Sequence, residues 1–142
     1  MNQQTQATTK AFFDLHTEGV GYLDRIRLVK PKKGEAFMAC TIAAMRGDSD
    51  DVNYTKFDCR VSGAEAKKWI DLLAPAVADD KKKVIVGFKI GDIYAEQFTY
   101  ENGERRGQTG VTIKGRLLKV KFAKVNGEFV TLPVNDAEVR AS

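Results

Sequence analysis

The chain has 142 residues, of which 43% are hydrophobic and 30% are charged, and its formal net charge is +4. These values are typical of one globular domain and exclude a disordered chain. The longest nearly apolar stretch, residues 36–45, is about half as long as the roughly 20 residues of a membrane span. The first residues are polar and contain no apolar core of a secretory signal. We therefore expect a cytoplasmic protein that does not contact a membrane.

The residues that usually carry catalysis or bind metals are few. The sequence has one histidine, His16, and two cysteines, Cys40 and Cys59. No nucleophile motif, zinc-ligand spacing or glycine-rich phosphate loop accompanies them. We therefore expect no enzymatic activity, no catalytic residue, no metal site and no cofactor.

Three segments in the first half of the chain alternate in the manner of strands, over residues 20–29, 36–45 and 52–61. A Pro-Gly turn at 30–34 separates the first two, and a polar loop at 46–51 separates the next two. The alternation groups the side chains of the second and third strands into an apolar set and an outward set. The apolar set is Met38, Cys40, Ile42, Phe57, Cys59 and Val61, and the outward set of the third strand is Tyr54, Lys56, Asp58 and Arg60.

The hydrophobic period then changes to that of a helix. Ser62 and Glu65 have the spacing of a capping box, which predicts a helix start. Apolar residues follow at helical spacing, and Trp69 among them is expected to pack the helix on the strands. Pro75 predicts that the helix ends or kinks there.

The second half returns to strand patterns, over residues 84–90, 93–100 and 107–125. Residues 101–103 form a hairpin signal, Gly110 and Gly115 predict bulges or bends, and residues 129–134 are expected to add a short strand. The predicted organisation is an N-terminal segment at 1–18, one domain at 19–134 and a flexible tail at 135–142.

The order of elements is therefore β-β-β-α-β-β. This order predicts a mainly β protein, a five-stranded OB-fold barrel with one helix between strands three and four. A five-stranded antiparallel sheet backed by one helix has the same order and stays open as an alternative.

Several segments resemble bacterial single-stranded-DNA-binding proteins, from about Gly21 to about Lys124. The similar segments are Gly21-Tyr22-Leu23, residues 34–43, residues 54–63 and the hairpin at 98–106. More closely, FFDLHTEGVGYLDRIR, ACTIAAM and FDCRVSG are similar to a family of replication or single-strand-binding-like proteins carried on integrating conjugative elements. The resemblance implies single-stranded DNA as the partner, assembly as a dimer or tetramer, and a role in replication or transfer of a mobile element.

The resemblance transfers the family's base-stacking positions unevenly. Phe98 matches the hairpin aromatic, whereas Lys56 and Ser62 occupy two other stacking positions, and a fourth falls near Arg46. This loss of aromatics favours an alternative function, an OB-fold module that binds replication or conjugation proteins and has weak or no affinity for DNA.

The residue types required for binding a single strand are present independently of the resemblance. Such binding needs cations for the phosphates and exposed aromatics for the bases. Phe98 is compatible with either a core or a stacking role, and the lysines at 81–83 with either a solvated turn or a phosphate contact. The candidate nucleic-acid-binding residues are Lys32, Lys33, Phe37, Tyr54, Lys56, Arg60, Phe98, Tyr100, Arg105 and Arg106.

Overall fold

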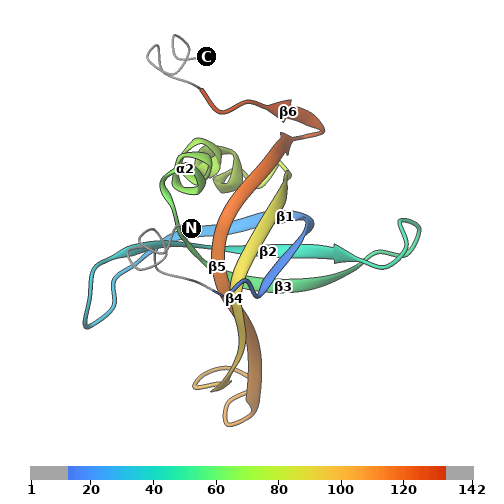
Figure 1. Cartoon of the computed structure of the whole chain (residues 1–142). Coiled ribbons are helices and arrows are strands. Elements are labelled where there is room, and N and C mark those ends of the chain that lie inside the picture. The colour runs from blue at the N-terminus through green and yellow to red at the C-terminus, as the bar shows by residue number, and fades with distance from the viewer. Residues whose placement is uncertain (1–12, 134–142) are drawn as a thin grey trace, which may run out of the picture.

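A computed structural model describes residues 13–133, and Figure 1 shows its arrangement. Within this range the chain forms six strands and one helix. In chain order they are β1 (His16–Val29), β2 (Phe37–Arg46), β3 (Asn53–Val61), α2 (Ala64–Ala78), β4 (Val84–Thr99), β5 (Thr109–Val125) and β6 (Glu128–Val130). No helix in the described range is long and apolar enough to cross a membrane.

The first five strands form a closed barrel. Antiparallel pairing gives the order β3-β2-β1-β4-β5-β6, and β3 also pairs with β5 in parallel, which closes the sheet. This confirms the predicted five-stranded OB-like barrel with its helix between strands three and four, and it excludes the open sheet. Figure 1 shows α2 near one end of the barrel, while the β4–β5 hairpin extends beyond the other end.

The barrel interior is filled by the apolar side chains that the alternation assigned to it. Ile42 and Phe57 face each other across β2 and β3, and the Phe57 ring lies 6.3 Å from that of Phe88. Trp69 and Ile70 of α2 belong to the same buried cluster. The predicted packing of Trp69 between helix and barrel is therefore confirmed.

The predicted capping box does not form. The helix begins at Ala64, its N-cap is Gly63 with a φ of 93°, and no side chain caps it. The hydroxyl of Ser62 instead accepts a hydrogen bond of 2.7 Å from Arg116. This partner on β5 fixes Ser62 one residue before the cap, where it cannot serve the first helical amides.

Pro75 does not end the helix, because α2 continues to Ala78. A proline in a helix leaves the carbonyl four residues earlier without its usual donor. That residue, Asp71, is exposed, so water can satisfy its carbonyl. The last turn of the helix therefore forms despite the proline.

The strand boundaries differ most around β4. The predicted strands at 84–90 and 93–100 are one continuous strand, whose pairing with β5 shifts between Gly91 and Tyr94. Asp92, with a φ of 53°, lies at this irregularity. The shift occurs opposite Gly115, where a bulge was expected, whereas Gly110 pairs regularly with Phe98. β1 begins at His16, four residues before the predicted strand.

Candidate nucleic-acid interface

The outward face of β2 carries three small residues in its middle, Ala39, Thr41 and Ala43. Longer side chains stand beside them on the neighbouring strands. Ala39 lies between Arg27 of β1 and Arg60 of β3 in the strand register. The small side chain and both arginines line one hollow.

The same arrangement repeats along β2. Thr41 lies between Asp24 and Asp58, and Ala43 lies between Tyr22 and Lys56. The small residues form a shallow floor, and charged or aromatic side chains of β1 and β3 form its sides. The pleat of the sheet directs all of these side chains outward.

Two adjoining hollows cover β3 and reach the β4–β5 hairpin, with volumes of about 350 and 420 Å³. Both hollows include Asp58, and we call the two together the groove. Its lining is rich in cations and aromatic rings from five strands and the start of the hairpin loop. The cations are Arg25, Arg27, Lys56, Arg60 and Lys114, and the aromatic residues are Phe37, Tyr94, Phe98 and Tyr100.

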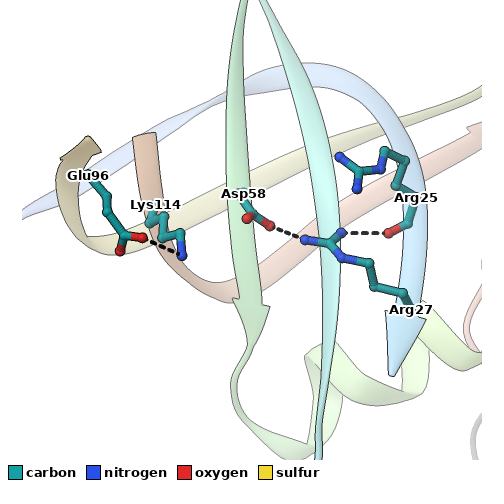
Figure 2. A network of polar contacts seen from close by, with 5 residues as sticks. All are labelled: Arg25, Arg27, Asp58, Glu96 and Lys114. Atoms are coloured by element: carbon teal, nitrogen blue, oxygen red, sulfur yellow. Dashed lines mark hydrogen bonds and ion pairs between the residues drawn. The ribbon is translucent and has the colours of Figure 1, made fainter. Parts of the chain in front are cut away.

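Asp58 in the groove and Glu96 beside it each contact a cation, as Figure 2 shows. Arg27 reaches across β2 and binds Asp58, and its other terminal nitrogen donates to the Arg25 carbonyl at 2.9 Å. The Lys114 ammonium lies 3.1 Å from Glu96. These pairs neutralise both carboxylates. Arg25, Lys56 and Arg60 form no ion pair within the described range.

A β-bulge on β1 brings Arg25 into the groove. The pairing of β1 with β2 shifts between Asp24 and Arg27, and Arg25 takes a φ of 50°. The Asp24 carboxylate supports this turn by accepting the Arg25 amide hydrogen at 2.8 Å. Bulges redirect side chains in this way next to functional sites. The sequence signal is the three-residue spacing between the buried Leu23 and the partly buried Ile26, which packs against the same core.

Two aromatic rings of the β4–β5 hairpin lie against each other at the groove. The rings of Phe98 and Tyr100 are 4.9 Å apart and meet edge to face. Phe98 lies over Gly110, where an added Cβ would be 2.5 Å from the Phe98 Cζ. Because Phe98 is 37% exposed and lies outside the core cluster, its core alternative is not supported.

Cations lie directly on two of the aromatic rings. The Arg60 guanidinium is 4.2 Å from the centre of the Phe37 ring. Arg105 lies 5.5 Å from the centre of the Tyr100 ring and donates to its hydroxyl at 3.2 Å. These contacts combine a flat apolar surface with positive charge, which is the combination that stacked nucleotides require.

The remaining candidates lie farther from the groove. Tyr54 lines a neighbouring hollow together with Lys56. Arg106 is exposed in the hairpin loop, and Lys32 and Lys33 are exposed in the β1–β2 turn, outside the two hollows that form the groove. The structure thus brings together Phe37, Lys56, Arg60, Phe98 and Tyr100, with Arg105 attached through Tyr100. Sequence reasoning missed Arg25, Arg27, Tyr94 and Lys114 as groove residues.

The two thiols lie beneath this surface. Cys40 and Cys59 face each other across β2 and β3, and both are free and buried. The hydrogen bond with Cys40, followed by burial, raises the pKa of the Cys59 thiol. Within residues 13–133, no group of three or more histidine, cysteine or acidic side chains is placed to hold a metal ion.

On another face of the barrel, Glu18 is bound by Lys121. The hydrogen bond with Lys121 and its positive charge lower the pKa of the Glu18 carboxyl. Both groups belong to strand surfaces away from the groove lining. This ion pair therefore leaves the groove charges unchanged.

Comparison with known proteins gives one family. The family model described as "Protein of unknown function (DUF3577)" matches residues 6–138, and the chain belongs to this family. Neither the search of curated proteins nor the search of solved structures returned a match.

Proposed function

We propose that this member of the DUF3577 family binds single-stranded DNA in the groove, without strong sequence preference. The observation that carries the proposal is the joining of five cations and four aromatic side chains in one continuous hollowed surface. Every base has a flat face that stacks on an aromatic ring, and every nucleotide has a phosphate that attracts a cation. Such a surface accepts many sequences.

The distribution of charge supports a path for the strand along β3. Arg60 and Lys56 stand on the same outward face, separated by Asp58, whose charge Arg27 neutralises. At the hairpin, Phe98 and Tyr100 offer rings beside Arg25. Phosphates therefore find cations along the whole groove, and bases find rings at both of its ends.

The cellular role follows from the resemblance to proteins of integrating conjugative elements. We propose that DNA binding serves replication or transfer of a mobile element, in the cytoplasm. A homo-oligomer, dimer or tetramer, and association with replication or conjugation proteins belong to the same proposal.

One observation favours the alternative function, a protein-interaction module. Asp58 and Glu96 place two carboxylates in or beside the groove, and each consumes the charge of one cation. A surface of mixed charge also suits a protein partner. The two functions differ in how strongly single-stranded DNA binds and in how binding depends on salt.

Fluorescence anisotropy with labelled oligo-dT over a series of salt concentrations tests the proposal. If about four to six phosphates are neutralised, the logarithm of affinity should fall with the logarithm of salt at a slope of about −3 to −4. A hairpin duplex with the same number of phosphates is the control and should bind more weakly. Equal affinity for duplex and single strand, or a flat salt response, would instead support the protein-interaction module.

A further inference from the structure

A third hollow, of about 500 Å³, adjoins the groove at Lys56, which lines both. It lies where β1, β2 and β3 meet the end of α2 and the turn that leads to β4. Its lining combines two tyrosines with aspartates and lysines, and we call it the tyrosine hollow. The polar and aromatic lining residues are Tyr22, Asp24, Tyr54, Lys56, Asp79, Asp80, Lys82 and Lys83.

The two tyrosine rings of this hollow form an aromatic wall. Tyr22 and Tyr54 have their ring centres 6.0 Å apart. Tyr54 is 45% exposed, so one part of its ring is free for a further flat partner. A strand that follows the outward face of β3 from Arg60 passes Lys56 and then meets Tyr54.

The polar lining of the hollow differs from that of the groove. Three aspartates, Asp24, Asp79 and Asp80, balance its three lysines, so the hollow offers phosphates no excess of positive charge. The C-terminus of α2 adds negative character to the hollow, because the last turn of the helix contains no basic residue and Asp79 follows it directly. The hollow is therefore rich in hydrogen-bond acceptors.

The aspartates keep accepting capacity in the free protein. One oxygen of Asp79 accepts the Lys81 amide hydrogen at 3.0 Å, and one oxygen of Asp24 accepts that of Arg25. Each of these carboxylates has a second oxygen. Asp80 is exposed and accepts no hydrogen bond from the described residues. A ligand with N–H donors finds acceptors here at little cost.

Stacking rings beside unpaired acceptors match a nucleobase that carries an exocyclic amino group. Cytosine and adenine present such a group, whereas thymine and uracil present a carbonyl oxygen at the equivalent place. Thymine and uracil offer a carboxylate only the N3–H, which lies between two carbonyl oxygens, whereas an amino group offers two N–H donors. We infer that the tyrosine hollow takes one base of a strand bound in the groove and prefers cytosine or adenine to thymine or uracil. This inference rests on the proposed function and adds a local base preference to it.

Binding of two oligonucleotides that differ in one base tests the inference. A 15-mer of dT carries either dC or dU at its centre, so that an amino group with an unprotonated N3 is compared with a carbonyl and an N3–H. The dC oligonucleotide should bind about 3- to 10-fold more tightly, as the net contribution of one hydrogen bond allows. The Tyr54→Leu, Asp80→Ala double variant should bind both oligonucleotides with equal affinity.

Asp50→Ala provides the matched control, because Asp50 is an exposed acid of the β2–β3 loop that does not line the hollow. This variant should keep the dC preference. Equal affinity of the unaltered protein for dC and dU oligonucleotides would overturn the inference, as would a full dC preference in the double variant. Both of these outcomes leave oligo-dT binding itself intact. Failure of all the oligonucleotides to bind would instead contradict the proposed function.

Discussion

Alternate residues of β2 and β3 form the inward and outward faces of these two strands. The inward face contributes to the core, whereas the outward face lines the groove. Inward, Ile42 and Phe57 are part of the buried cluster that joins the strands to α2. Outward, Thr41 and Lys56 line the groove. Within one strand, residues that stabilise the fold therefore alternate with residues that form the binding surface. Substitution of an inward residue should lower stability, whereas substitution of an outward residue should weaken binding. This contrast can be tested.

The two faces also differ in the size of their side chains. In the middle of β2, Cys40 and Ile42 of the inner face fill the closed barrel. On the outer face, the small residues Ala39, Thr41 and Ala43 lie between Phe37 and Met45, and larger residues there would fill the trough between β1 and β3. A binding surface on this sheet thus depends on the small side chains in the middle of β2 as much as on the charged and aromatic side chains of β1 and β3.

The largest expected effect is on the inner face. Ile42 is fully buried, with 0% of its surface exposed, so Ile42→Ala should lower the free energy of unfolding by about 2 to 5 kcal/mol. Its neighbour Thr41 lines the groove, and its hydroxyl oxygen is buried without a hydrogen-bond partner among the described residues. Thr41→Ala should therefore cost less than about 1 kcal/mol. Urea unfolding of the two variants measures both values.

An equal loss of stability in the two variants would contradict this division of β2 into two faces. In that case the Thr41 side chain would contribute to packing as much as that of Ile42.

The second expected effect is on the outer surface, at the hairpin. Phe98→Ala should weaken oligo-dT binding by about 1 to 3 kcal/mol, the usual contribution of one base stacked on an aromatic ring. Its melting temperature should change little, because the ring lies outside the core. Gly110→Ala should weaken binding too, because its new methyl group displaces the Phe98 ring. Anisotropy titrations and thermal melts provide the two measurements.

Phe129→Ala is the matched control, because Phe129 is an aromatic residue that is 72% exposed on β6, away from the groove. Its loss should leave oligo-dT affinity unchanged. If Phe98→Ala binds normally while folded, or if Phe129→Ala weakens binding equally, the hairpin rings do not stack on bases.

The strands and the helix were predictable because local hydrophobic periodicity determines most of these elements. The period of two assigned Cys40 and Ile42 to the interior, and the change to a helical period located α2 between β3 and β4. Closure of the barrel was different. It depends on the parallel pairing of β3 with β5, for example Phe57 with Ile113, and no local signal specifies such a distant contact. The open sheet therefore remained possible at the level of sequence.

The groove was only partly predictable for the same reason. Lys56 and Arg60 were found because they share one face of one strand. Lys114 was missed because it comes beside Asp58 only when β5 pairs with β3. Arg25 was missed because a bulge on β1 directs it into the groove. Ser62 was assigned to a cap that its bond with Arg116, distant in the chain, prevents.

The smallest expected effect separates two basic loops that the sequence treated alike. Arg105 contacts Tyr100 at the groove, whereas Lys32 and Lys33 lie in the β1–β2 turn outside it. Arg105→Ala with Arg106→Ala should reduce affinity for oligo-dT and flatten the salt slope by about one to two units, because up to two phosphate contacts are lost. Lys32→Ala with Lys33→Ala removes the same charge and should change the slope by less than half as much. Salt titrations of the two double variants provide the measurement, and circular dichroism checks that both are folded. Equal slopes in the two variants would mean that long-range charge, and not the aromatic hairpin, determines where the strand binds.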